Sequence, residues 1–292
     1  MPVPLRHCSR PRRPSMRVAY VTFEDREVDT EIPVVLGAWA AEGLDGEALR
    51  WDDAEADWSA FDAAVIRSTW DYVPRRAEFT AWARRTSQVT RLFNPAGVIE
   101  RNTDKTYLRD LAAAGIPIVP TEWFGPGDEP VLANDWAETV VKPNVSVGAQ
   151  DTSRHDSREG ATAAIRAIQE SGRTAMVQPY LDMVEAEGET SLLFFGGRYS
   201  HAVRRPAMLA RDGSGALATG DPREAAADQL ELARAVLAEI GEPLLYARVD
   251  LVRSASGDPL LIELELTEPH LFLAAHEKAP ARFAGALRDL LA

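Results

Sequence analysis

Cysteine is nearly absent from this chain of 292 residues, and the one that occurs is Cys8. A single cysteine excludes a disulfide within the chain, and it also excludes metal sites built from several thiolates. A chain without structural disulfides suits a reducing compartment, so we expect a cytoplasmic protein.

Long apolar runs are missing as well. No stretch reaches the roughly 20 apolar residues that a membrane-spanning helix requires, so no membrane association is expected. The opening segment MPVPLRHCSRPRRPS is basic and rich in proline, and it lacks the apolar centre of a secretory signal. We therefore predict a disordered basic tail over residues 1–15, followed by a first strand that begins at Met16.

Positive charge is too scarce for a nucleic-acid-binding protein. The chain has 45 acidic residues against 32 lysines and arginines, which gives a net charge of −13. Phosphate backbones require clustered cations, so nucleic acid is excluded as a partner. Hydrophobic residues make up 46% and charged residues 26%, as in an ordinary globular protein. Small molecules are therefore the expected partners.

Lysine is the rarest charged residue. Only three of the 32 cationic side chains are lysines, namely Lys105, Lys142 and Lys278. A chain that relies on arginine for surface charge can keep lysine where a compact point charge is needed. Lys105 and Lys142 both lie in segments with other functional features. The alternatives are a surface position for Lys105 and simple strand termination by Lys-Pro for Lys142.

Strands and helices alternate over residues 16–101, which predicts a small parallel α/β domain. The strand patterns cover 16–23, 61–72 and 91–95, and the helix patterns cover 31–43 and 75–88. Ligands of parallel sheets lie beyond the carboxyl ends of the strands, which is where the segment RSTWDY falls.

Beyond residue 101 the chain predicts an α+β arrangement. Helix patterns cover 103–115, 157–171 and 223–241, with Thr103 or Asp104 as N-cap of the first. Strand patterns cover 116–124, 138–144, 174–181, 189–197, 198–205, 244–253 and 259–266. Gly196-Gly197 joins two of these strands in a hairpin, and the turn SASGDP joins the last two.

Three carboxylates meet if the last hairpin has the expected register. In PLLIELEL, Glu263 and Glu265 alternate with apolar residues and therefore share one face of the strand. Asp250 on the partner strand faces Glu263, unless the register slips by one residue. Like charges at this spacing require a counter-cation, and an all-oxygen set favours Mg²⁺ or Mn²⁺. Seen alone, such a strand more often has a solvated face.

The segment after Lys142 is a loop of small residues, NVSVGAQD. Its backbone N–H groups, with Ser146 and Gly148, are suited to folding over phosphates, although the glycine spacing of a Walker motif is absent. Further on, Pro179 interrupts the strand in MVQPYLD and frees backbone groups for an adenine edge. A plain edge strand containing proline is the alternative.

The order of these features resembles the ATP-grasp superfamily. The segments IRSTWDY, FNPAGVIERNTDKTYLRDLAAAGIPIVPT, VVKPNVSVGA, SHAVRR and ARVDLV are most similar to a bacterial subgroup that includes the O-ureido-serine cyclo-ligase of cycloserine biosynthesis. Glutathione synthetase is similar more distantly. The resemblance implies a pre-ATP-grasp domain over 16–101, a small ATP-grasp subdomain over 102–183, and a C-terminal subdomain with the metal site over 184–292.

The resemblance also implies the ligands, which are ATP and Mg²⁺ or Mn²⁺. The implied nucleotide-binding set, with Glu189 at the ribose, is Lys105, Lys142, Ser146, Gly148, Gln178, Tyr180, Leu181 and Glu189. The implied metal ligands are Asp250, Glu263 and Glu265. Two departures from the family pattern stand out: Glu-x-Glu replaces the commoner Glu-x-Asn, and the phosphate loop has only one glycine.

The implied activity is a carboxylate–amine ligation on a small amino-acid-like substrate. A substrate carboxylate takes the γ-phosphate of ATP, and an amine then displaces phosphate from the acylphosphate. Arg204 and Arg248 are the predicted catalytic cations, with Arg205 as the alternative to Arg204. The predicted substrate residues are Arg67, Thr69, Trp70, Asp71 and Tyr72, with Arg67 gripping a carboxylate and Asp71 meeting an amine or, alternatively, capping a helix. Intramolecular cyclisation, a small-molecule kinase, a non-catalytic interaction protein and a homo-oligomer remain open alternatives.

Overall fold

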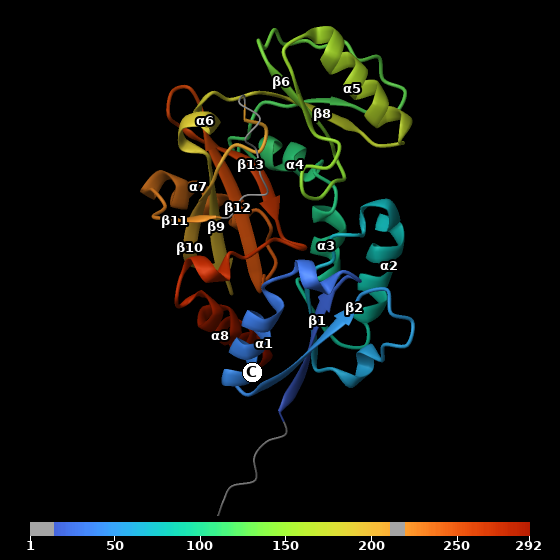
Figure 1. Ribbon diagram of the computed structural model, residues 1–292, viewed down its shortest axis with the longest axis vertical. Coiled ribbons are helices and arrows are strands. Elements are labelled where there is room, and N and C mark those ends of the chain that lie inside the picture. Colours follow the sequence, from blue (N-terminus) through green and yellow to red (C-terminus); the bar gives the residue numbers. More distant parts are fainter. Residues whose placement is uncertain (1–14, 211–219) are drawn as a thin grey trace, which may run out of the picture.

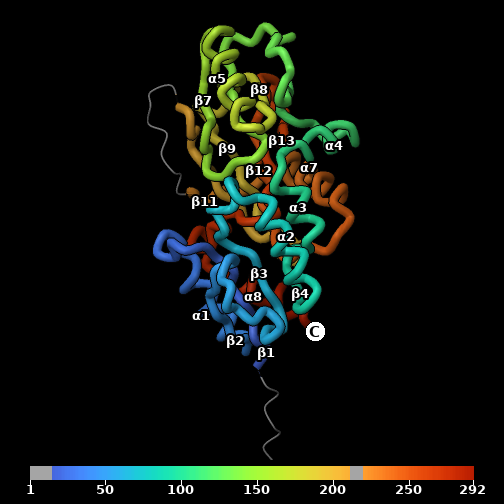
Figure 2. Tube along the Cα trace, turned by 90° about the vertical axis from the view of Figure 1, so that its right-hand side faces the viewer, coloured from blue at the N-terminus to red at the C-terminus, as the bar shows by residue number. Residues whose placement is uncertain are grey.

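The computed structural model describes residues 15–210 and 220–292, so the tail predicted over 1–15 lies outside the described residues except for Ser15. Three sheets follow one another along the longest axis of the molecule (Figure 1). The turned view in Figure 2 shows the sheet nearest the N-terminus at one end and the small sheet with α5 at the other. The chain is therefore of mixed α/β class, as predicted, with one parallel sheet and two antiparallel sheets.

The first sheet is parallel and has the strand order β2-β1-β3-β4. Its strands are β1 (Met16–Thr22), β2 (Leu44–Arg50), β3 (Ala63–Ser68) and β4 (Arg91–Phe93), and its helices are α1 (Ile32–Ala41), α2 (Arg76–Thr86) and α3 (Ala96–Asn102). The sequence patterns missed β2 because it is an edge strand rich in polar residues. Gly46 within it packs so tightly on Leu36 and Trp39 that a Cβ atom would clash at 2.7 Å.

The small sheet is antiparallel and has the order β5-β8-β6-β7. Its strands are β5 (Glu122–Phe124), β6 (Thr139–Pro143), β7 (Ser153–His155) and β8 (Ala175–Pro179), packed against α5 (Arg158–Glu170). The helix expected over 103–115 is α4 (Tyr107–Ala113), with Thr106 as its N-cap. Lys105 thus precedes the helix instead of lying in its first turn, because residues 103–106 form a turn.

The central sheet has the order β11-β10-β9-β12-β13 and is antiparallel. Its strands are β9 (Glu189–Phe195), β10 (Arg198–Arg205), β11 (Asp221–Arg223), β12 (Tyr246–Arg253) and β13 (Pro259–Glu265). Both predicted hairpins are present, β9–β10 through Gly196-Gly197 and β12–β13. Three helices complete this part of the chain: α6 (Met183–Glu187), α7 (Ala227–Ala238) and α8 (Ala279–Leu291).

One hydrophobic core joins the two ends of the chain. Trp39 of α1 lies 6.3 Å from Phe283 of α8 between ring centroids, and Phe283 lies 5.2 Å from Phe195 of β9. The buried Asn94 side chain donates to the carbonyls of Tyr246 and Leu266 at 2.9 and 2.8 Å. The N-terminal sheet and the central sheet therefore share one hydrophobic core. The domain boundaries given above stay a prediction.

In the described residues, none of the helices has the length and apolar character needed to span a membrane. The short 3₁₀ segments are Arg26–Val28, Trp58–Ala60, Val73–Arg75 and Leu273–Ala275.

Candidate active site

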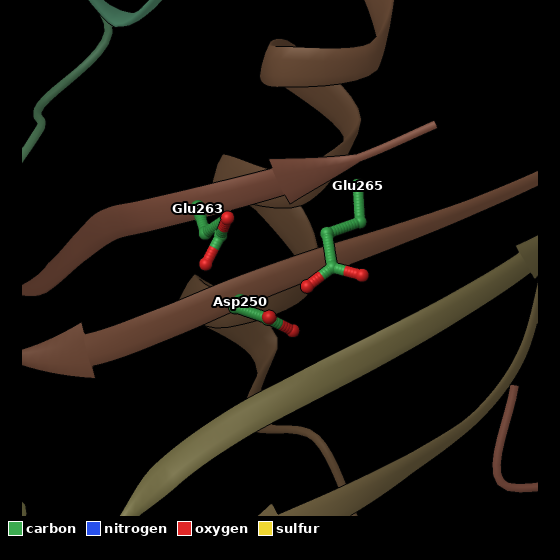
Figure 3. A group of neighbouring side chains, drawn as sticks. All are labelled: Asp250, Glu263 and Glu265. Atoms are coloured by element: carbon green, nitrogen blue, oxygen red, sulfur yellow. The ribbon is translucent and has the colours of Figure 1, made fainter. Parts of the chain in front are cut away.

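Three carboxylates from β12 and β13 converge on one face of the central sheet (Figure 3). Asp250 pairs directly with Glu263 across the hairpin, and Glu265 follows on the same face two residues later. One oxygen from each of these three side chains lies within 4.8 Å of the others. The predicted register is therefore confirmed.

Two arginines neutralise this cluster. The Arg248 guanidinium lies 2.9 Å from an Asp250 oxygen and also pairs with Glu265, while Arg205 lies 3.6 Å from Asp250. Burial opposes ionisation of Asp250, but the two guanidinium groups outweigh it and hold the pKa of this carboxyl below its usual value. Burial, with the neighbouring Glu263 and Asp250, raises the pKa of Glu265 to about 8 in spite of Arg248.

The donor set fits a divalent metal ion. Three clustered carboxylates offer only oxygen atoms, which is the ligand type that Mg²⁺ and Mn²⁺ prefer. Glu265 replaces the amide of the commoner family pattern, and its carboxyl group pairs with Arg248.

Both predicted lysines act on Glu263, one of the three carboxylates. Lys105 Nζ lies 3.3 Å from Glu263, and it donates to the Ser146 carbonyl at 2.8 Å and to its hydroxyl at 3.1 Å. Lys142 is buried at the end of β6, and burial lowers its pKa. Lys105 and Lys142 together outweigh the burial of Glu263 and lower the pKa of that carboxyl. The structure thus brings both lysines to the carboxylates.

The predicted phosphate loop (residues 144–151) and the predicted adenine-binding linker (residues 178–181) have a defined geometry. Residues 147–152 form turns, with Gly148 at φ +61 in the left-handed region that favours glycine. Gln178 donates to Thr121 Oγ1 at 2.9 Å, and the Arg154 guanidinium carbon lies 4.7 Å from the centre of the Tyr180 ring.

The linker ends in a short helical turn and then enters β9. The Leu181 carbonyl accepts a hydrogen bond from the Val184 amide at 3.0 Å, which begins that turn. Glu189, the first residue of β9, pairs with Arg205. The ribose role of Glu189 stays a prediction.

The RSTWDY segment lies against the loop that follows β13. The Trp70 indole donates to the Glu268 carbonyl at 3.0 Å, and the Tyr72 hydroxyl interacts with the Glu268 carboxylate. Asp71 accepts from the Trp51 indole at 2.8 Å and from Arg75 at 2.7 Å, so its carboxylate is already paired.

Two of the predicted arginines already have partners in the structure, although the Arg67 Nε and Nη1 atoms are buried without a hydrogen-bond partner in the described residues. Arg67 is 1% exposed, pairs with Glu31 at 3.3 Å and donates to the Pro269 carbonyl at 2.7 Å. Arg204 donates to the Glu187 carbonyl at 2.8 Å.

Arg205, the alternative to Arg204 on β10, has the position that was predicted for Arg204. Successive residues of a strand point to opposite faces of the sheet, so only one of the pair 204 and 205 can face the carboxylates, and that one is Arg205. Arg67 is buried and paired with Glu31, and its role in gripping a substrate carboxylate stays a prediction.

Polar residues that the sequence patterns did not identify hold β13 in place from its outer edge. The Tyr107 hydroxyl donates to the Leu264 carbonyl and accepts from the Leu264 amide, both at 2.9 Å. Asn102 donates to the same carbonyl at 2.7 Å and accepts from the Leu266 amide at 2.7 Å. Periodicity could not reveal them, since their partners lie about 160 residues away in the sequence.

Comparisons with known proteins agree on the class. Residues 18–94 match the family model of the D-cycloserine synthetase DcsG N-terminal domain. The cycloserine biosynthesis protein DcsG of Streptomyces lavendulae is 38% identical over 283 residues, which cover 90% of this chain and 95% of that protein. The crystal structure of D-cycloserine synthetase DcsG superposes with a TM-score of 0.87 at 37% identity, covering 94% of this chain and 100% of that one.

More distant structures share the fold. The D-alanine–D-alanine ligase of Bacillus anthracis, solved with ATP, has a TM-score of 0.67 at 13% identity, with 95% of this chain and 97% of that chain covered. A RimK-domain ATP-grasp protein of Sphaerobacter thermophilus has a TM-score of 0.66 at 19% identity, with coverage of 94% and 99%.

Fold and site together define an ATP-grasp enzyme, an ATP-dependent ligase that forms carbon–nitrogen bonds. Within that class, the chain belongs to the D-cycloserine synthetase family.

Proposed function

We propose that this ligase closes a ring within a single amino-acid-like substrate, an O-ureido-serine, which is the substrate that the sequence resemblance implies. Two relatives are named a cycloserine biosynthesis protein and a D-cycloserine synthetase, which supports the proposal. The observation that carries the proposal is the 38% identity extending over 95% of the cycloserine biosynthesis protein. The activated group is the substrate carboxylate, whose oxygen takes the γ-phosphoryl group of ATP with release of ADP. The ureido nitrogen bonded to oxygen then attacks the acyl carbon, loses its proton, and expels phosphate.

The chain's own cations would hold the reacting phosphates. Lys105 and Lys142 supply compact charges for the β- and γ-phosphates, and both are held in fixed positions by burial. We assign the acylphosphate to Arg205 and Arg248, because both already contact the Asp250 carboxylate. Arg205 replaces Arg204 in this proposal.

A divalent cation, Mg²⁺ or Mn²⁺, is proposed at Asp250, Glu263 and Glu265, and its chemistry would be to neutralise charge on the transferring phosphoryl group. Three oxygen ligands within 4.8 Å of one another support this assignment. The segment of residues 144–151 would cover the phosphates and exclude water, since acylphosphates hydrolyse readily. The Ser146 hydroxyl, already bonded to Lys105, would take part in this cover.

Adenine would lie against the linker at Gln178, Tyr180 and Leu181, with the ribose near Glu189. The pocket for the substrate would be lined by Thr69, Trp70 and Tyr72. The buried Thr69 hydroxyl has no hydrogen-bond partner in the described part of the chain, which supports a ligand contact there. We also propose that the enzyme works in the cytoplasm.

The test is an assay of the purified protein for ADP, phosphate and product with ATP, Mg²⁺ and O-ureido-serine, with and without added amino acids. We expect ADP and phosphate in equal amounts and a cyclised product, detected by mass spectrometry, without any added amine. A dependence on an added amine would instead show intermolecular ligation. ADP without phosphate release would show a kinase.

A further inference from the structure

The loop after β13, residues 266–273, is clamped to the N-terminal part of the chain. The Trp70 indole donates to the Glu268 carbonyl at 3.0 Å, and the Arg67 guanidinium donates to the next carbonyl at 2.7 Å. The Glu31 carboxylate accepts two backbone N–H groups of the same loop, each at 2.9 Å. These four bonds come from side chains that are buried or partly buried, so they fix the backbone of the loop around Glu268.

The Glu268 carboxylate faces the active site. The charged groups that act on it most strongly are Lys105, Glu263 and Arg248, all members of the site. Its own partner is the Tyr72 hydroxyl, a neutral group. Burial raises the pKa of Glu268 to about 7, although Tyr72 and Lys105 oppose the shift. In residues 15–210 and 220–292, no cation lies within ion-pair distance of this carboxylate.

The surrounding carboxylates differ from Glu268 in this respect. Each of them has an arginine or lysine partner in the structure: Asp71, Glu189, Asp250, Glu263 and Glu265. Glu268 is half-buried, and even partial desolvation of a carboxylate is costly when no opposite charge offsets it. Glu268 is therefore the acidic group of the site that remains available to a cationic ligand.

We infer that Glu268, supported by Tyr72, binds the ammonium group of the amino-acid-like substrate; this inference rests on the proposed function. A charge-assisted hydrogen bond from the ammonium would satisfy the half-buried carboxylate. The ammonium is attached next to the substrate carboxylate, so its binding also sets the direction of that carboxylate toward Lys105 and Arg248. A substrate without the amine would leave Glu268 unpaired, which is a strong basis for selectivity.

The first test compares Glu268→Gln with the wild type in the ADP-release assay with O-ureido-serine. We expect the KM for O-ureido-serine to rise by about 10- to 100-fold, since a buried charge pair loses one partner. The affinity for ATP, measured by calorimetry, should stay within about 2-fold, because Glu268 lies outside the set of nucleotide-binding residues. Glu277→Gln is the matched control: it makes the same change at an exposed position four residues beyond the loop and should leave both values unchanged.

The second test removes the amine from the substrate instead of the acid from the enzyme. The analogue 3-(ureidooxy)propionate keeps the carboxylate and the ureido group but has no ammonium. We expect the wild type to lose about 10- to 100-fold in kcat/KM with this analogue, and Glu268→Gln to lose less than about 3-fold. Tyr72→Phe keeps the ring stacked on Phe79 and should give a smaller rise in KM.

The outcomes separate the two proposals. If the wild type turns over O-ureido-serine but Glu268→Gln discriminates against the analogue as strongly as the wild type, the ammonium role is wrong while the cyclo-ligase function stands. Absence of wild-type turnover would overturn the proposed function and this inference with it. Unfolding temperatures of all variants should match the wild type within about 3 °C. If Glu268→Gln does not fold, the KM of Tyr72→Phe for O-ureido-serine tests the ammonium role independently.

Discussion

Glu263 is the residue on which the proposed metal site depends most. It lies opposite Asp250 in the hairpin and 3.3 Å from Lys105. We predict that Glu263→Gln lowers kcat by about 1000-fold, because the loss of one charged ligand removes several kcal/mol of stabilisation from the transferring phosphoryl group. Steady-state ADP release measures this effect.

The same substitution should leave the fold intact. Removing one of three neighbouring like charges relieves repulsion, and this offsets the loss of the pairing with Lys105. Thermal unfolding without nucleotide or metal is the control. A large drop in melting temperature would show that Glu263 is mainly structural, contrary to the metal-ligand assignment.

Lys142 provides a second prediction at this scale. Its ammonium is buried at the end of β6, and burial lowers its pKa. Lys142→Arg should reduce kcat/KM for ATP by about 100-fold, since a planar guanidinium neither fits the space nor replaces a point charge on phosphate. Circular dichroism confirms folding. Activity near the wild-type value would contradict a phosphate-binding role for Lys142.

Residue type alone selected some of these positions more sharply than others. The scarcity of lysine pointed to Lys105 and Lys142, and the structure brings both to the carboxylates. The abundance of arginine allowed no such choice. Arg67 was predicted at the substrate, the structure pairs it with Glu31, and its substrate role stays a prediction. A side chain's charge can be read from the sequence, but its partner depends on which segments meet in space.

At the scale of elements, the β12–β13 hairpin was the most predictable part of the site. Alternation of apolar and acidic residues defines the face, and the short turn limits the register. The choice between Arg204 and Arg205 was not predictable, since either face of β10 could have been turned toward the site. Only the pairing of β10 with β9 resolves it.

His201 of β10 makes the stability of this region depend on pH. One ring nitrogen faces the Leu271 and Phe272 carbonyls at 3.1 and 3.2 Å, and burial lowers the pKa of the ring to about 4. Between pH 6.5 and 4 the unfolded chain binds a proton at this histidine and the folded chain does not. We therefore predict that acidification across this window removes about 3 kcal/mol of folding free energy through His201.

Urea unfolding at several pH values measures this contribution. His201→Gln should lower stability at pH 7 and flatten its dependence on pH between 6.5 and 4, because the titrating group is gone. The other histidines and the carboxylates are unchanged in this comparison. Parallel pH curves for the two proteins would contradict a neutral, buried His201.

At the scale of the whole molecule, the last helix belongs to the same core as the first sheet. Phe283 of α8 is fully buried among Trp39, Phe195 and Tyr246. We predict that Phe283→Ala costs about 3–5 kcal/mol of unfolding free energy, which is usual for the loss of a buried aromatic ring. Chemical unfolding followed by tryptophan fluorescence and by far-ultraviolet circular dichroism would measure it.

The two signals should shift together in Phe283→Ala, because the N-terminal and central sheets share this core. Ala286→Gly, a milder change on the same helix, is the control and should cost about 1 kcal/mol. A fluorescence transition separate from the circular dichroism transition would mean that the N-terminal sheet unfolds independently, as the predicted domain boundary at residue 101 would suggest.

The sequence by itself determined what is local: the alternation that gives β13 its acidic face, the hairpin that brings Asp250 to Glu263, and the rare lysines at the edges of predicted elements. Periodicity and turn chemistry act over a few residues, so they can be read without the fold. Only the tertiary structure decided which distant groups meet, such as Arg205 with Asp250, Arg67 with Glu31, and Trp70 with the loop that carries Glu268. These contacts join segments separated by up to about 200 residues, and burial of a shared core is the physical cause that brings them together.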